Sequence, residues 1–271
     1  MSKLYSKSNT ELDWPDYICG KSFAQISKWV LCDRYQIKFI SEEIQENDIV
    51  FLNLEIFNQF VNHIYNNRPR HKFILITFNS DKSFTDYHYG LIKDFVVKIY
   101  AMNNTCHNEM VKYVPIGFRD WPNETRKEIK EVGNIQTYKH NLVYMNFVIK
   151  TNIQKRTECF NTMNHNWVTK KNNIPIREFY LDLKQSKYAL SPEGTGIDCH
   201  RIYECIYFDT IPILKSSLMD DFYKTLPVII VNSWQDVTEN FLLHNYDTYY
   251  NKLIKWKKEN DWLSPLYWIN R

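Results

Sequence analysis

The sequence predicts an α/β protein made of two halves, each with a sheet of parallel strands and helices between them. Short apolar runs typical of buried strands alternate with segments that have helical spacing, which is the pattern of an α/β fold. The alternation stops in a charged stretch at residues 119–140 and then starts again. A chain of 271 residues is also long enough for two domains.

The first half has four predicted strands. DIVFLNL (48–54) and KFILITFNSD (72–81) flank the helical segment FNQFVNHIYNN (57–67). FVVKIYAMN (95–103) and VKYVPIGF (111–118) follow as two further strands. Strands joined by short helical or turn segments indicate a doubly wound sheet.

The second half repeats this organisation. Its predicted strands are NLVYMNFVI (141–149), KYALS (187–191), TIPILK (210–215) and LPVIIVN (226–232), and its predicted helices are QKRTECFNTMN (154–164), CHRIYECIYF (199–208) and WQDVTENFLLHN (234–245). We therefore expect an N-terminal domain at 1–140, a C-terminal domain at 141–255, and a helical, aromatic tail at 256–271 that docks back on the N-terminal domain.

Charge and cysteine content exclude several classes of function. The net charge is +3 and the basic residues are scattered, which argues against binding of duplex nucleic acid but leaves a small anionic ligand open. The six cysteines are widely spaced, with no zinc-type cluster, so we expect reduced thiols and no metal. No signal-peptide pattern and no run of ~18 apolar residues is present, which predicts a soluble, cytoplasmic protein without a transmembrane segment.

Two of the chain's six glycines, Gly194 and Gly196, lie in a turn between a predicted strand and a predicted helix. Glycines in such a turn let the backbone approach a ligand, and we expect Asp198 to cap the helix that follows. The free N–H groups and partial positive charge of a helix N-terminus favour an anion such as phosphate. The alternative is that the glycines merely turn the chain.

The helix after this turn has a polar face. Arg201 and Glu204, three residues apart, share that face, whereas Ile202 and Ile206 share an apolar one. An arginine at this position suits a diphosphate, and a carboxylate can accept hydrogen bonds from a ribose diol. The alternative is a surface ion pair between the two charged residues.

The segment SPEGTGIDCHRIYECIYFDTIPIL (191–214) closely resembles the signature of exostosin-like glycosyltransferases of family 47, in which a Ser-Pro-x-Gly turn precedes His-Arg-x-x-Glu and a proline-containing strand. Three further segments are similar to small, virus-encoded members of that group: ITFNSDKS (76–83), YVPIGF (113–118) and NFVIKTNIQKR (146–156). Together these segments are spread over about half of the chain.

The resemblance implies a GT-B fold, in which two Rossmann-like domains face a cleft and a C-terminal helix crosses back. It implies an inverting transfer of a sugar from a UDP-sugar, with UDP-xylose a candidate, to a glycan hydroxyl. No permanently bound cofactor and no metal are then expected, and the partners are the nucleotide sugar and the glycan acceptor. The chain is much shorter than animal exostosins, so we expect addition of a single sugar rather than heparan synthesis.

The donor site that the resemblance implies has Arg201 on the diphosphate and Glu204 on the ribose. Arg156 is the second candidate for the diphosphate, the alternative being a solvated helix arginine, and His200 is a diphosphate or turn contact. The full set of donor residues is Arg156, Ser191, Glu193, Gly194, Gly196, His200, Arg201 and Glu204. Two guanidiniums can stabilise the departing diphosphate in place of a metal.

The catalytic base is expected in the N-terminal half. Asp81 ends a predicted strand, at the edge where ligand crevices of open α/β sheets form, although an Asx-turn role explains it equally well. Other carboxylates that remain open are Asp13, Asp16 and Glu55. The acceptor-binding residues would be Asp13, Trp14, Asn79 and Ser80. A non-catalytic nucleotide- or carbohydrate-binding module and a GDP-fucose-type transferase are the alternative functions.

Overall fold

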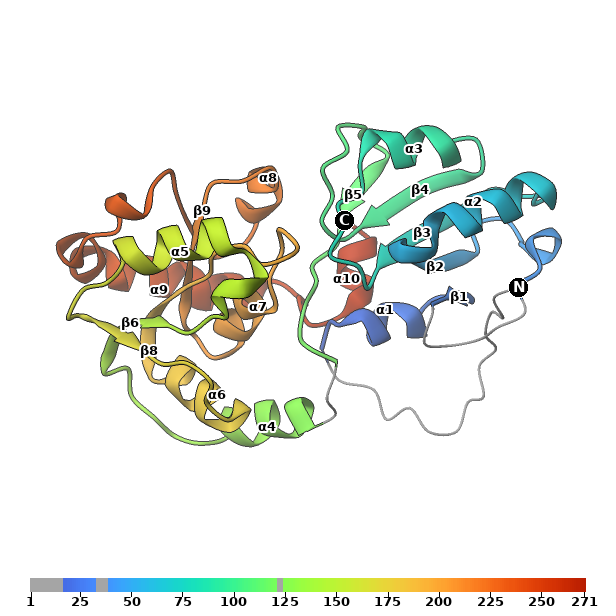
Figure 1. The fold of residues 1–271 in the computed structure, drawn as a ribbon. Helices are drawn as coiled ribbons and strands as arrows, with labels where there is room; N and C mark the ends of the chain where they lie inside the picture. The colour runs from blue at the N-terminus through green and yellow to red at the C-terminus, as the bar shows by residue number, and fades with distance from the viewer. Residues whose placement is uncertain (1–16, 33–38, 121–123) are drawn as a thin grey trace. The chain divides into compact units, whose positions relative to one another are not determined.

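The computed structural model describes residues 17–32, 39–120 and 124–271 (Figure 1). Contacts divide the chain into two compact units, the first running to Ile116 and also taking in Trp262–Arg271, the second formed by Gly117–Asp261. Each unit contains a five-stranded sheet in which every strand pair is parallel, so the predicted α/β class with one parallel sheet in each half is confirmed.

In the first unit the strand order follows the chain order, β1-β2-β3-β4-β5. The strands are β1 (Trp29–Leu31), β2 (Ile49–Asn53), β3 (Phe73–Phe78), β4 (Val96–Ala101) and β5 (Val111–Tyr113). The helices are α1 (Gly20–Gln25), α2 (Phe57–Asn66), α3 (Asp86–Ile92) and α10 (Pro265–Ile269), with single 3-10 turns at η1 (Ser41–Glu43) and η2 (Leu54–Ile56).

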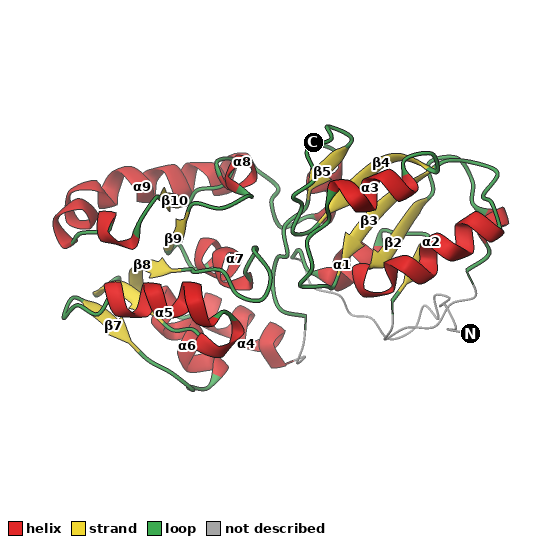
Figure 2. Ribbon diagram, turned by 45° about the horizontal axis from the view of Figure 1, so that its top comes forward, coloured by secondary structure: helices red, strands yellow, loops and turns green. Residues whose placement is uncertain are grey.

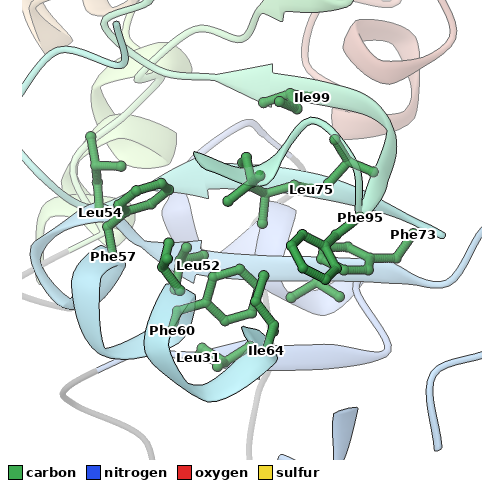
Figure 3. Packing of buried hydrophobic residues seen from close by; sticks show 14 of the residues in the cluster. Leu31, Leu52, Leu54, Phe57, Phe60, Ile64, Phe73, Leu75, Phe95 and Ile99 are labelled. Carbon is green, nitrogen blue, oxygen red and sulfur yellow. The ribbon is translucent and has the colours of Figure 1, made fainter. Parts of the chain in front are cut away.

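The main core of the first unit lies between α2 and the sheet (Figure 3). Alternate strand residues such as Leu52 and Leu75 face Phe60 and Ile64 of α2, and all four are almost fully buried. Side chains on the opposite sheet face meet α1 and α10: the Tyr100 hydroxyl donates a hydrogen bond to a carbonyl of α10. The C-terminal residues therefore complete the first unit.

In the second unit the order is β10-β9-β8-β6-β7. The strands are β6 (Asn141–Met145), β7 (Val168–Lys170), β8 (Ser186–Leu190), β9 (Ile211–Lys215) and β10 (Ile229–Val231). The helices are α4 (Glu124–Gly133), α5 (Ile153–Thr162), α6 (Ile176–Lys184), α7 (His200–Tyr207), α8 (Asp220–Tyr223) and α9 (Glu239–Glu259), with 3-10 turns at η3 (Ile149–Thr151) and η4 (Trp234–Asp236).

This order changes direction at β6, because the chain first adds β7 on one side and then β8 on the other. In open α/β sheets, ligands bind at such a switch point, beyond the carboxyl ends of the two strands. The first sheet has no reversal of this kind, so the predicted doubly wound form is wrong for the first half. The topology therefore places the expected ligand crevice at the ends of β6 and β8.

Helices cover both faces of the second sheet, and Figure 2 shows α5, α6, α7 and α9 around its strands. On one face, Cys159 of α5 and Leu253 of α9 pack against Val143 and Ile213. On the other face lie α6 and α7, with α4 packed against α6. None of the helices in the described ranges is both long and apolar enough to cross a membrane.

The boundary between the units lies before Gly117, earlier than the predicted residue 140. The reason is α4, which is charged and exposed on one side but packs onto the second unit. Arg177 of α6 bridges Glu128 and Glu131 of α4 at 2.8 and 2.7 Å. The tail was predicted to begin at residue 256, but α9 continues to Glu259 within the second unit. The part of the tail that belongs to the first unit begins at Trp262.

Candidate functional site

The candidate site lies where β6 and β8 end, at the switch point of the second sheet. After β8 the chain makes the glycine-containing turn, and α7 begins at His200 with Cys199 as its N-cap. After β6 the chain makes η3, and α5 begins with Asn152 as its N-cap. The Asn152 side-chain amide donates to the Gly194 carbonyl at 2.9 Å, which ties the two loops together.

Two buried arginines lie over the same aromatic ring in this crevice. The Cζ atoms of Arg156 and Arg201 are 5.6 and 5.8 Å from the centroid of Phe147, and both residues are 7% exposed. Arg156 is thus not a solvated helix arginine, because it points inward from α5. Among the described residues, no carboxylate forms an ion pair with either guanidinium.

Backbone carbonyls hold both arginines. Arg156 donates from Nε to the Glu193 carbonyl at 2.9 Å and from Nη1 to the Val148 carbonyl at 3.0 Å. Arg201 donates from Nη2 to the Asn146 carbonyl. Burial, together with the charge of Arg201, lowers the pKa of Arg156. Two adjacent cations without a neutralising carboxylate form an arrangement that an anion would stabilise.

The turn glycine Gly194 makes room for one of these arginines. A Cβ atom at this position would stand 2.8 Å from Arg156 Nη2, closer than real contacts allow. The sequence suggested that glycine lets the backbone approach a ligand, whereas the group that approaches Gly194 here is a guanidinium of the same chain. Beside it, Gly194 N–H donates to the Gly196 carbonyl at 3.1 Å, and Glu193 forms an ion pair with Lys155.

Glu204 is completely buried and forms an ion pair that the sequence did not reveal. Its Oε1 accepts from the Tyr180 hydroxyl at 3.1 Å and lies 3.4 Å from Nε of Arg119. The expected alternative, a surface pair between Arg201 and Glu204, is therefore wrong. The charge of Glu204 raises the pKa of Arg119.

Two buried polar atoms of α7, Arg201 Nε and Glu204 Oε2, have no hydrogen-bond partner within the described chain. Buried polar groups are nearly always paired, so such atoms mark positions where a ligand or water belongs. Both residues belong to the polar face that the sequence predicts for this helix. Ser191, also named from the sequence, is buried at the end of β8.

His200 and Asp198 have contacts inside the protein. His200 Nδ1 donates to the carbonyl of Gly117 at 2.8 Å, and burial lowers the pKa of His200, which favours the neutral ring. Asp198 does not cap α7 as predicted, because the helix begins one residue later. Its carboxylate instead accepts from the hydroxyls of Tyr203 and Tyr223 at 2.7 and 3.3 Å.

The first unit presents a second polar group at the ends of β2 and β3. Ser80 Oγ donates to Glu55 Oε1, and Lys82 Nζ donates to Glu55 Oε2, both at 2.6 Å. Asp81 is exposed beside them, and Asn79 has a left-handed backbone with φ of 54°. The predicted residues Asp13, Trp14 and Asp16 lie outside the described residues.

The described residues contain no group of three or more His, Cys, Asp or Glu side chains arranged to hold a metal ion.

Comparison with known proteins points to the second unit. The family described as RXYLT1 C-terminal domain matches residues 132–264. Ribitol-5-phosphate xylosyltransferase 1 of Danio rerio is 27% identical over 74 residues, which is 27% of this chain and 17% of that protein. The matched segment thus spans a small part of the relative's length.

Two solved structures show a distant likeness. An α1,3-fucosyltransferase with GDP-fucose aligns with a TM-score of 0.41 and 9% identity over 86% of each chain. A GtfA/B complex aligns with a TM-score of 0.40 and 10% identity over 80% of this chain and 55% of that one. The region similar to the RXYLT1 C-terminal domain contains Arg156, Arg201 and Glu204.

Proposed function

We propose that this protein is a glycosyltransferase that transfers a sugar from a nucleotide-sugar donor to a glycan hydroxyl, with the donor bound in the second unit. The observation that carries the proposal is the pair of buried arginines, Arg156 and Arg201, over Phe147 at the switch point of the sheet. A nucleotide diphosphate supplies the anion that this pair lacks. Similarity to the RXYLT1 C-terminal domain, in the same region, supports this assignment.

The donor we propose is a UDP-sugar, with xylose as the sugar. The name of the zebrafish relative, a xylosyltransferase, supports xylose. Glu204 would accept hydrogen bonds from the ribose hydroxyls, because its Oε2 has no hydrogen-bond partner among the described residues. Ser191, Glu193, Gly194, Gly196 and His200 would form the wall of the site around the diphosphate.

The reaction we propose is a direct displacement with inversion. A base removes the proton of the acceptor hydroxyl, the hydroxyl oxygen bonds to the anomeric carbon, and the bond from that carbon to the diphosphate oxygen breaks. The negative charge then moves onto the departing UDP, where the two guanidiniums stabilise it without a metal. We propose Asp81 as the base, with Asn79 and Ser80 beside it on the acceptor.

A thermal-shift panel of UDP, GDP, CMP and their sugars tests the donor assignment. We expect UDP and UDP-xylose to raise the melting temperature and CMP to leave it unchanged. A larger shift with GDP would favour the fucosyl-type alternative, and no shift with any nucleotide would refute the nucleotide site. Binding of UDP-xylose without release of UDP, with or without glycan acceptors, would indicate a non-catalytic module.

A further inference from the structure

We propose that Arg119 is a positioning residue for the nucleotide: it holds the Glu204 carboxylate so that one oxygen faces the ribose diol. This inference rests on the proposed nucleotide site, and it adds a residue from the segment 117–120, outside the motif that carries Arg201 and Glu204. The segment is where the chain passes from the first unit into the second.

The surroundings of Glu204 give Arg119 this role. Glu204 has no exposed surface, and a buried carboxylate is costly unless a cation pairs with it. Tyr180 of α6 donates a hydrogen bond from its neutral hydroxyl to Glu204. On α7 itself, burial lowers the pKa of His200 and raises the pKa of Cys205, which favours the neutral form of both side chains. Arg119 is thus the cation that the described structure pairs with Glu204.

The two oxygens of Glu204 are used differently. Oε1 contacts both Arg119 and Tyr180, which anchors that oxygen of the carboxylate. Oε2 has no partner and is enclosed, so a diol reaches it after a local shift of the side chains that cover it. Ribose hydroxyls carry no charge and cannot replace the cation. Arg119 is therefore needed in the ligand-bound state as well as in the free one.

Arg119 is itself restrained. Its Cζ lies 5.7 Å from the ring centroid of Phe179, an aromatic residue of α6, while its side chain keeps 39% exposure. Next to it, Gly117 has a φ of 66° and its carbonyl accepts from His200. The segment 117–120 is thus joined to α7 at two points, one of them the residue that would bind ribose.

The test compares UDP with 2′,3′-dideoxy-UDP, which lacks the diol. In Arg119→Met, which keeps a long apolar side chain but loses the charge, we expect UDP to bind about tenfold or more weakly, the scale of a hydrogen bond to a charged group. Binding of dideoxy-UDP should change by less than about twofold, because that ligand has no hydroxyl to place on Glu204. Arg119→Lys should restore part of the UDP affinity.

Two further variants sharpen the interpretation. In a Glu204→Gln background, Arg119→Met should cause little additional loss of UDP affinity, because the two residues act as one unit. Arg177→Met, which removes the partly exposed arginine that joins α4 to α6, is the matched control and should leave the affinity for both nucleotides unchanged. Circular dichroism of each variant verifies that it is folded.

Equal losses for UDP and dideoxy-UDP would overturn the inference, since Arg119 would then act on the fold or on the diphosphate. Unchanged or tighter UDP binding in Arg119→Met would overturn it too, the latter because Arg119 would be competing with the ligand. Failure of the wild type to bind UDP, GDP or CMP would instead refute the proposed nucleotide site. The two failures are therefore distinguishable.

Discussion

Arg156 lies directly against the backbone of Gly194, so that a Cβ atom at position 194 would stand 2.8 Å from Arg156 Nη2. The guanidinium cannot retreat easily, because it donates to the carbonyls of Glu193 and Val148 and is buried. Glycine at position 194 thus leaves room for the guanidinium of Arg156, which belongs to the proposed diphosphate site.

Gly194→Ala should therefore damage both stability and binding. Forcing an extra methyl group into a packed site typically costs about 1–3 kcal/mol, and we expect that loss in the free energy of unfolding by urea. The melting-temperature rise with UDP should also shrink, since Arg156 must move. Gly90→Ala is the control: nothing lies within 4 Å of a Cβ there, and alanine in the exposed helix α3 should stabilise slightly. Equal behaviour of the two variants would contradict the clash.

Removing either arginine should abolish most of the UDP-induced stabilisation. In Arg201→Ala the apo melting temperature should stay nearly unchanged, because the charge is buried without a carboxylate partner and its loss also relieves repulsion with Arg156. Thermal shift and isothermal titration with UDP measure the effect. Full UDP stabilisation in both Arg156→Ala and Arg201→Ala would show that the diphosphate binds elsewhere.

Sequence patterns predicted the strands that lie in longer apolar runs and missed β1 and β7. β2 and β3 are almost entirely apolar, so their burial could be predicted from their composition. β1 and β7 have three residues each and, unlike β5 and β10, lie outside any predicted apolar run; they are held by pairing with the neighbouring strand. Their presence depends on the sheet and not on local preference.

The same distinction separates the site residues. Arg201 and Glu204 could be proposed because a turn and a helix place them together within a short segment. Arg119 could not, since it contacts Glu204 across 85 positions of sequence and lies in the charged stretch at 119–140 where no strand or helix was predicted. The unit boundary was misplaced for a related reason: α4 is held by ion pairs to α6, which only the fold brings near.

Lys139 should make the stability of the second unit depend on pH. Its ammonium donates to the Phe208 carbonyl and Thr210 Oγ1, both at 2.9 Å, and burial lowers its pKa from 10.5 to about 7. Between these two values the unfolded chain binds a proton that the native protein lacks, so stability from this group rises with pH. Below pH 7 both states are protonated and the slope disappears.

Urea unfolding of wild type and Lys139→Met at pH 7 and pH 9 measures this contribution. The free energy of unfolding of the wild type, relative to the variant, should increase with pH by up to about 1.4 kcal/mol per pH unit. Lys252→Met, which removes an exposed lysine of α9, is the control: its free energy of unfolding should change with pH as that of the wild type does. Parallel curves for Lys139→Met as well would show that Lys139 titrates alike in both states.

Transfer should survive treatment with EDTA, because Arg156 and Arg201 supply the positive charge that the departing diphosphate needs. The measurement is UDP release from the donor in the presence of acceptor, with and without chelator. Complete loss of activity, restored by manganese or magnesium, would refute the metal-free mechanism.

The catalytic base is tested by comparing Asp81 with Glu55. A base must have a carboxylate oxygen available to the acceptor hydroxyl, and both oxygens of Glu55 already accept short hydrogen bonds, from Ser80 and Lys82. Asp81 is exposed at the same edge of the sheet. Asp81→Asn should therefore lower turnover by about 10²–10⁴-fold, the usual contribution of general-base catalysis, whereas Glu55→Gln should keep at least about a tenth of it.

The UDP affinity of Asp81→Asn should stay within about twofold of the wild type, because the proposed donor residues belong to the other unit and a base acts only on the acceptor proton. This separates loss of chemistry from loss of donor binding, which a fall in activity alone would not do. If Asp81→Asn retains turnover and Glu55→Gln loses it, Glu55 is the base, and Ser80 and Lys82 then orient it. If both variants remain active, the proton is removed by another group, and Asp13 and Asp16 are the next carboxylates to replace.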